Sequence, residues 1–282
     1  MTLSSLDERT AAIPTRLGAL HVRQVGRGRT TVLWPSMFVD SHTWDRLLPL
    51  LPRDRHYVLV DGPGLGLSQP LTRESDIPEA AAAAVDLLEG LSVSEPVDWV
   101  GNAFGGHVGF ELATRPGVLR SLAAVSAPTE PVSAEIRRSI RVLRPLLRAL
   151  GPVRPVRAAI LDAMLTDASR ADAQVRGVVL ASLGRPSRTS LSLAVASFIL
   201  NRVDVNDILG DIRVPSLFVA SDDRGDWSPQ DAAAAARRTP DARVETVVGA
   251  RTLIPLEQPR ALALLLQSFW AEVDAHPSAG SA

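Results

Sequence analysis

Residues 97–106 read Val-Asp-Trp-Val-Gly-Asn-Ala-Phe-Gly-Gly, and this stretch decides the fold. An apolar strand runs without a break into a turn with glycines on both sides, and the turn leads directly into a helix. The residue at the centre of such a turn sits at a strained, positive φ, where bulk on either side would clash. That residue is Ala103, flanked by Gly101 and Gly105. The stretch therefore predicts a strand, a sharp turn and a helix, with an alanine at the tip of the turn.

Strand and helix patterns alternate on both sides of this turn. Short apolar or β-branched runs predict strands at residues 17–25, 30–34, 57–60, 119–125, 216–220 and 243–248. Helical spacing, often with a proline at the start, predicts helices at residues 44–51, 78–91, 104–115, 229–238 and 259–273. Strands that alternate with helices favour a parallel, doubly wound sheet.

The middle of the chain breaks this alternation. From about residue 130 to 211 no strand pattern occurs, and helical stretches are interrupted at Pro145, Gly151-Pro152, Pro155 and Gly184-Arg185-Pro186. We interpret the interruption as a helical lid inserted into one sheet domain. The predicted division is a core of residues 1–129 and 211–282, with residues 130–210 as the lid.

Composition excludes several chemistries and partners. The chain has 282 residues, 46% of them hydrophobic, and a formal net charge of -1, which argues against a nucleic-acid partner. No run approaches the roughly 20 apolar residues of a membrane span, so we expect a cytoplasmic protein without membrane association. Cysteine and lysine are both absent, which excludes thiol nucleophiles, disulfides and Schiff bases. No pair of histidines has metal-ligand spacing, and we expect neither metal nor cofactor.

Three segments together resemble the α/β-hydrolase superfamily, in the branch of epoxide hydrolases, haloperoxidase-like esterases and C–C bond hydrolases. The turn at residues 101–105 is similar to the G-x-S-x-G nucleophile elbow. Residues 61–68, D-G-P-G-L-G-L-S, resemble the family's D-x-P-G-H-G-x-S loop, and residues 256–259, L-E-Q-P, resemble the segment after its histidine. The resemblance implies an α/β-hydrolase fold, a mostly parallel, doubly wound sheet with an inserted helical lid.

The same resemblance implies a Ser-His-Asp triad, and the sequence departs from it at two positions. Ala103 stands where the family has its nucleophile, and the family's G-x-G-H is here Gly249-Ala250-Arg251-Thr252, which puts Thr252 at the histidine position. A methyl group cannot attack a carbonyl, and threonine cannot take a proton near neutral pH. Arg251 is interpreted either as a surface substitution, which we slightly favour, or as a cation for an anionic substrate group.

The acid position and the oxyanion loop remain. Asp223 best matches the family acid, with Asp226 next and Asp222 as a further alternative. The oxyanion loop, usually H-G, is here Pro35-Ser36, which leaves the backbone N–H groups of Met37 and Phe104 as donors.

Two independent losses in one triad favour a natural loss of hydrolysis. We therefore expect a non-hydrolytic enzyme, a cofactor-independent lyase, isomerase or cyclase of biosynthesis, in which Asp223 is the base. One alternative is a ligand-binding pseudoenzyme without turnover. The other is a hydrolase inactivated by an engineered Ser-to-Ala substitution.

The expected substrate is a largely apolar, oxygen-bearing small molecule. Asn102, inside the elbow, joins Ala103, Thr252 and Asp223 as a catalytic candidate. His107, four residues past Ala103, is interpreted chiefly as a core residue, with a place near the site as the alternative. The residues expected to bind substrate are Trp34, Ser36, Met37, Phe38, His42, Phe104, Asp226, Leu253 and Ile254.

One charge pattern suggests a macromolecular partner. Arginines recur at helical spacing at Arg137, Arg141, Arg144 and Arg148. The main interpretation is the solvated face of a surface helix, and the alternative is a docking face for an acyl carrier protein.

Overall fold

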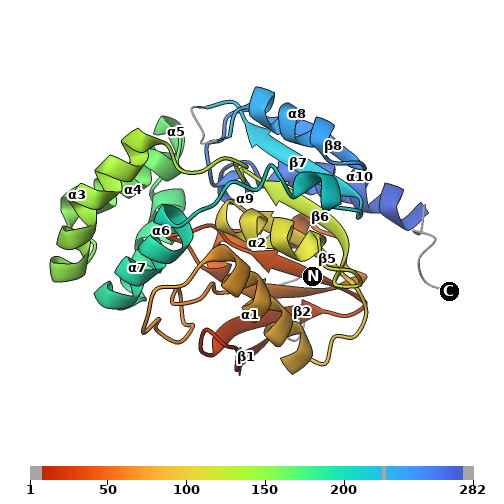
Figure 1. Cartoon of the computed structure of the whole chain (residues 1–282), viewed down its shortest axis with the longest axis horizontal. Coiled ribbons are helices and arrows are strands. Elements are labelled where there is room, and N and C mark those ends of the chain that lie inside the picture. The colour runs from red at the N-terminus through yellow and green to blue at the C-terminus, as the bar shows by residue number, and fades with distance from the viewer. Residues whose placement is uncertain (1–7, 224–226, 276–282) are drawn as a thin grey trace.

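The computed structural model describes residues 8–223 and 227–275 of the chain. Its centre is an eight-stranded sheet with the strand order β1-β2-β4-β3-β5-β6-β7-β8 (Figure 1). Strand β2 pairs antiparallel with both β1 and β4, and every pairing from β4 to β8 is parallel. The strands are β1 (Arg9–Ile13), β2 (Leu20–Gly26), β3 (Arg29–Trp34), β4 (Arg55–Val60), β5 (Val97–Asn102), β6 (Leu119–Val125), β7 (Ser216–Ser221) and β8 (Ala242–Val247). The predicted α/β-hydrolase fold is confirmed.

Helices cover both faces of the sheet. One face packs against α1 (Ile77–Gly90), α2 (Phe104–Ala113) and α8 (Pro229–Arg238). The other face packs against α10 (Pro259–Ala275) and the short turns η2 (Ser41–Trp44) and η3 (Leu48–Leu50). The short helix α9 (Ile254–Glu257) precedes α10, and the short turn η5 (Leu209–Asp211) precedes β7. Such a sheet, buried on both faces, needs strands that are apolar throughout, as the sequence pattern predicts.

The central strand β5 shows how the two layers of core meet. All six of its residues are buried, and alternate side chains enter opposite layers, Trp99 on the α2 side and Val100 on the α10 side. Trp99 stacks on Trp34 of the neighbouring strand β3 with ring centroids 5.4 Å apart. The strand that leads into the Ala103 turn is therefore fixed in the middle of the molecule.

A run of helices, the helical insertion, lies between β6 and β7 at one end of the sheet (green to teal in Figure 1). Its division from the core as a lid stays a prediction. Its members are α3 (Ala134–Leu150), α4 (Arg154–Met164), α5 (Asp167–Ala171), α6 (Ala173–Gly184), α7 (Arg188–Val195) and the π-helical turn η4 (Ala196–Leu200).

Two local predictions were wrong, and proline chemistry explains the first. The helix predicted at residues 44–51 is a pair of 3-10 turns, because Pro49 has no N–H to donate back along an α-helix. Pro145, predicted as a break, lies inside the continuous helix α3. Pro145 is exposed there, so water can satisfy the carbonyl group that loses its donor. Strand β1 was not predicted.

No helix in the described part of the chain is long and apolar enough to cross a membrane.

Candidate active site

The turn after β5 keeps the geometry of a nucleophile elbow around an alanine. Ala103 has φ 46 and ψ -102, and it caps the N-terminus of α2. Its N–H donates to the carbonyl of Val125 at 2.8 Å, which ties the elbow to the end of β6. A positive φ costs an alanine energy that a glycine would avoid. The elbow is thus held in its strained form by its surroundings and not by the preference of the residue at its tip.

The flanking glycines are needed because the backbone segments approach closely. A Cβ added at Gly101 would lie 2.1 Å from the carbonyl oxygen of Gly105. One added at Gly105 would lie 2.2 Å from the carbonyl oxygen of Trp34. Any side chain at either position would push the strand away from the helix, so both glycines are required for the elbow to form.

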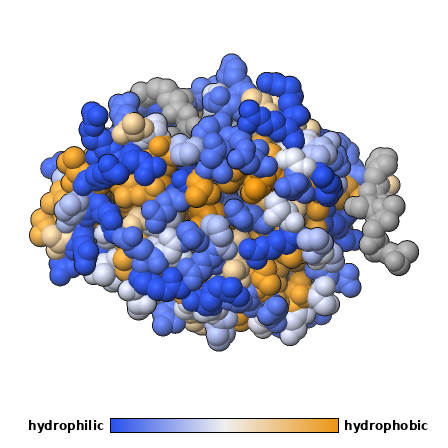
Figure 2. Space-filling view, viewed as in Figure 1, coloured by the Kyte–Doolittle hydropathy of each residue, from blue (hydrophilic) through white to orange (hydrophobic). Residues whose placement is uncertain are grey.

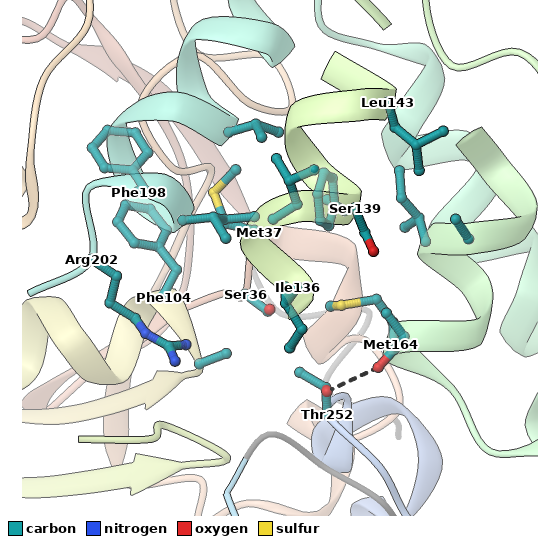
Figure 3. Close-up of a pocket in the computed structure, with 18 of the residues that line it drawn as sticks. Ser36, Met37, Phe104, Ile136, Ser139, Leu143, Met164, Phe198, Arg202 and Thr252 are labelled. Atoms are coloured by element: carbon teal, nitrogen blue, oxygen red, sulfur yellow. Dashed lines mark hydrogen bonds between the residues drawn. The ribbon is translucent and has the colours of Figure 1, made fainter. Parts of the chain in front are cut away.

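The two residues expected to supply backbone N–H donors, Met37 and Phe104, line the cavity together with Ala103. The N–H of Phe104 lies in the first turn of α2, where an amide has no acceptor within the helix and the helix dipole adds positive charge. Met37 follows Ser36 in the loop after β3, and the next residue, Phe38, has φ 69. Figure 3 shows Ser36, Met37 and Phe104 around one end of the cavity. These amides form a candidate oxyanion site.

Thr252, at the family's histidine position, is tied to the helical insertion. Its N–H donates to the carbonyl of Met164 at 3.3 Å, and its hydroxyl donates to the carbonyl of Ala163 at 3.3 Å (Figure 3). The Nδ2 of Asn102 donates to the carbonyls of Thr252 at 2.8 Å and of Val125 at 3.1 Å. Asn102 therefore holds the loop after β8 against the elbow.

Asp223, the predicted acid, pairs with an arginine. The Arg251 guanidinium lies 2.9 Å from the carboxylate of Asp223, and the Arg251 side chain is only 4% exposed. The same guanidinium donates to the backbone carbonyl of Asp162 at the end of α4. Arg251 is a buried bridge between the acid-position loop and the insertion, so its interpretation as a surface substitution was wrong. Arg251 also lines the cavity, so its interpretation as a cation for an anionic substrate group stays a prediction. A guanidinium has no lone pair to accept a proton, so it does not replace the family's histidine.

A cavity of about 780 Å³ lies between the elbow and the insertion. Its walls are mostly apolar side chains of α3 and α4, with polar groups near the elbow. Charged residues also line it, namely Glu135, Arg144, Asp162, Arg202 and Arg251. This composition suits a mostly apolar ligand held by a small number of hydrogen bonds. Across residues 8–223 and 227–275, no group of three or more His, Asp or Glu side chains is arranged to hold a metal ion.

The structure separates the predicted site residues into two groups. Those that line the cavity are Ser36, Met37, Phe38, Ala103, Phe104 and Thr252. Those that do not line it are Trp34, His42, Asn102, Asp223, Leu253 and Ile254.

Packing explains most of the second group. Trp34, Leu253 and Ile254 are fully buried in the core, and Asp223 is occupied by Arg251. His42 lies outside the cavity, where its Nδ1 pairs with Asp45 at 2.8 Å and the carboxylate raises its pKa. Asp226 falls outside the described residues, and its role stays a prediction.

Several polar residues of the cavity were given little weight or missed, among them Glu135, Ser139, Asp162 and Arg202 of the insertion side and two residues beside the elbow. His107 lines the cavity while being 3% exposed, in line with both of its interpretations. Ser126, just after β6, also lines the cavity, and like Phe38 and Ala103 it is a non-glycine residue at positive φ, with φ 48. The signal that identifies Ser126 is its position just after the strand that neighbours the elbow strand.

A strained elbow at the end of a central parallel strand, with backbone donors beside it and a cavity above it, defines the hydrolase class of this fold. Residues 31–263 match the sequence profile described as Alpha/beta hydrolase family. The chain belongs to the α/β-hydrolase family.

Named relatives show what this chain resembles. It is 29% identical over 200 residues to the pimeloyl-[acyl-carrier protein] methyl ester esterase of Photobacterium profundum, across 68% of this chain and 75% of the relative. A thermophilic esterase from Thermogutta terrifontis superposes with a TM-score of 0.82 at 20% identity, covering 94% of this chain and 99% of that one. The enol-lactonase from Burkholderia xenovorans gives a TM-score of 0.82 at 18% identity, covering 93% and 100%.

These comparisons overturn the activity predicted from the sequence. The relatives are esterases and a lactonase, and none of those named above is a lyase, isomerase or cyclase. The prediction of a non-hydrolytic cyclisation, elimination or isomerisation was wrong. It gave the missing triad groups more weight than the retained fold, elbow and oxyanion donors.

Proposed function

We propose that this chain is a hydrolase of activated acyl compounds, whose cavity binds a largely apolar acyl group with its carbonyl at the elbow. The observation that carries the proposal is Ala103 held at φ 46 beneath the cavity. Strain of this kind persists only where the surrounding structure enforces it, and it concentrates at functional sites. The methyl group of Ala103 leaves room for a carbonyl carbon and an attacking water above the elbow.

The backbone donors account for the stabilisation of the reacting carbonyl. As water adds, negative charge develops on the carbonyl oxygen, and the N–H groups of Phe104 and Met37 stabilise it. In a serine protease stripped of its triad, the oxyanion donors and substrate binding still accelerate hydrolysis by roughly 10³- to 10⁴-fold over water. Binding and these donors are the catalytic resources that we assign to this chain.

The missing histidine restricts the substrates. With Thr252 in its place, no imidazole protonates the leaving group, so that group must depart as a stable anion. Phenolates, enolates and thiolates meet this condition, whereas simple alkoxides do not. Water's oxygen forms the new bond to the carbonyl carbon, the bond to the leaving oxygen or sulfur breaks, and the proton of water passes to solvent. We therefore assign aryl esters, enol esters and thioesters as the substrate class.

An acyl carrier protein is the proposed source of the thioester. The relative named above acts on an acyl-carrier substrate, and α3 carries the exposed arginines Arg138, Arg141 and Arg148. Of the four arginines predicted for this face, Arg137 and Arg144 are half-buried and bonded within the chain. No ion pair joins the three exposed arginines to an acidic side chain in the part of the chain that the structure describes. Other residues of α3 line the cavity, so a partner docked on the arginines can deliver an acyl chain between α3 and α4. Figure 2 shows hydrophilic and apolar side chains interleaved over this end of the molecule.

Hydrolysis of p-nitrophenyl octanoate tests the proposal. We expect the wild type to exceed the Ala103→Leu variant by at least about tenfold in kcat/KM, because the larger side chain fills the space for water and carbonyl. Both proteins are purified identically, so contaminating esterases cancel. Equal rates for the two proteins would refute the proposal. Ala103→Ser combined with Thr252→His should raise the rate above that of the wild type.

The carrier part of the same experiment uses octanoyl-acyl carrier protein. Arg138→Glu with Arg141→Glu should lower kcat/KM for the carrier thioester about tenfold and leave the aryl ester unchanged. The matched control is Arg237→Glu with Arg238→Glu on the exposed end of α8, which should change neither rate. Equal losses of kcat/KM in the two double variants would contradict the proposal that α3 is the docking face.

A further inference from the structure

His107 is a buried polar residue of the cavity that the proposed reaction does not use. It lies one helical turn after Ala103 on α2 and is 3% exposed. Its Nε2 lies 2.7 Å from the carbonyl oxygen of Pro128, in the segment after β6. A carbonyl oxygen only accepts hydrogen bonds, so Nε2 carries the hydrogen and donates it.

The tautomer leaves the other ring nitrogen as an acceptor. Burial, aided by the charge of Arg202, lowers the pKa of His107 to about 3, so the ring is neutral at physiological pH. Nδ1 therefore has a lone pair, and this atom is buried with no hydrogen-bond partner among the described residues. A buried acceptor without a donor is costly, and a ligand donor that displaces the packing over Nδ1 from the cavity side removes that cost.

Other buried polar atoms without partners do not offer the same interaction. The indole nitrogens of Trp34, Trp44 and Trp227 are donors in residues that do not line the cavity. The Oδ1 of Asn102 is an acceptor, and Asn102 does not line the cavity either. Among the described residues that line the cavity, only His107 has a buried hydrogen-bond acceptor without a partner.

The position of His107 sets where the ligand donor lies. It lies three positions after Phe104 in the helix, a rise of about 4.5 Å along the axis of α2. The cavity walls next to it include Ser126 and Pro128, at the end of β6. A group that reaches Nδ1 from a carbonyl bound at the elbow is thus a few covalent bonds from the carbonyl carbon.

We propose that the cavity selects acyl compounds with a hydroxyl group a few bonds from the carbonyl carbon, and that His107 Nδ1 accepts the hydrogen of that hydroxyl. The selection rests on the proposed function, since that function places the carbonyl at the elbow. His107 acts as a specificity residue and not as a base, because a neutral ring with so low a pKa takes up a proton poorly.

The test compares two methyl ketones of equal chain length, one with a hydroxyl at the β-carbon and one without, which bind without being hydrolysed. Calorimetry should show the wild type binding the hydroxylated ketone about 5- to 20-fold more tightly. His107→Phe keeps a ring and removes the acceptor, so the preference should fall to within about twofold. The control His56→Phe, at a histidine that pairs with Gln24 far from the cavity, should keep it.

Each outcome of the binding experiment supports or overturns the role of His107. Equal affinities in the wild type, or a preference that survives in His107→Phe, would overturn the inference. If His107→Phe does not fold, the ¹⁵N resonance of Nδ1 in the wild type serves instead, and it must shift with the hydroxylated ketone and not with the other. If both ketones bind equally and Ala103→Leu abolishes their binding, the inference is rejected and the proposed function stands. No binding of either ketone would reject both.

Discussion

The two ends of the central sheet differ in what gathers there, a cluster of charged side chains at one end and strained backbone beside a cavity at the other. At the amino ends of the parallel strands, Asp98 of β5 accepts from Arg120 at 3.0 Å, from the Ser121 hydroxyl at 2.6 Å and from Arg55. Asp274 of α10 pairs with the same two arginines, at 2.7 Å from Arg120 and 3.2 Å from Arg55. This cluster, which we call the paired end, uses its charges to join β4, β5, β6 and α10.

At the carboxyl ends of the same strands, the elbow end, strain and incomplete pairing collect around the cavity. Phe38, Ala103 and Ser126 all have positive φ there, and His107 keeps an unpartnered Nδ1. The comparison shows that one strand, β5, carries stabilising polar contacts at its start and binding features at its end. Stability and ligand binding are thus assigned to opposite ends of one sheet.

The largest effect is expected at the paired end. Asp98→Ala should destabilise the fold by about 3–5 kcal/mol, because it removes the buried carboxylate from Arg55 and leaves only the half-exposed Asp274 as its partner. Urea denaturation measures the change in free energy of unfolding. Arg55 also lies 4.3 Å from the centre of the Trp270 ring, and that contact remains in the variant.

Glu272→Ala is the matched control for a charge pair at the surface. Glu272 pairs with Arg243 at 2.5 Å, but its side chain is 57% exposed. Exposed pairs contribute about 0–1 kcal/mol, so this variant should lose no more than that. Similar losses in the two variants would contradict the view that the paired end stabilises the fold.

A smaller and pH-dependent effect is expected at the elbow end. The pKa of His107 is about 3 in the folded chain and near its ordinary value of 6.5 when unfolded. Between these values the unfolded chain binds the extra proton, so stability is complete above about pH 6.5 and falls as the pH drops. The slope is about 1.4 kcal/mol per pH unit. In His107→Phe this contribution is absent.

Urea denaturation at pH 4, 5, 6 and 7 measures that slope. The wild type should lose more stability than His107→Phe on going from pH 6 to pH 4, by about 2–3 kcal/mol. Parallel curves would mean that folding does not lower the pKa of His107. Nδ1 would then be protonated below about pH 6.5, and its assignment as an acceptor would fail in that range.

The sequence predicts the fold well because local chemistry and global packing agree. The glycines around Ala103, the apolar strand 97–102 and the prolines at helix starts each allow few other structures. The helix predicted at residues 44–51 failed because helical spacing outweighed the missing donor of Pro49. Strand β1 gave little signal, because as an edge strand it is mostly exposed.

The site was predictable at the elbow and much less so away from it. Ser36, Met37, Phe38 and Phe104 follow from the family pattern, since their positions are set by neighbouring strands. The Arg251 bridge to Asp223 was not predictable, because it depends on how the insertion folds back against the loop after β8. The activity was mispredicted for a related reason, since a sequence shows missing groups more clearly than it shows a retained binding geometry.

The most direct measurement of the central claim is a crystal structure of the chain with an eight-carbon methyl ketone bound. The account predicts that the ketone oxygen lies within about 3.1 Å of the backbone nitrogens of Phe104 and Met37, with the alkyl chain running along α3 and α4. A ketone bound anywhere else, or bound in the cavity with its oxygen directed away from both nitrogens, would contradict the claim that the elbow around Ala103 holds the substrate carbonyl.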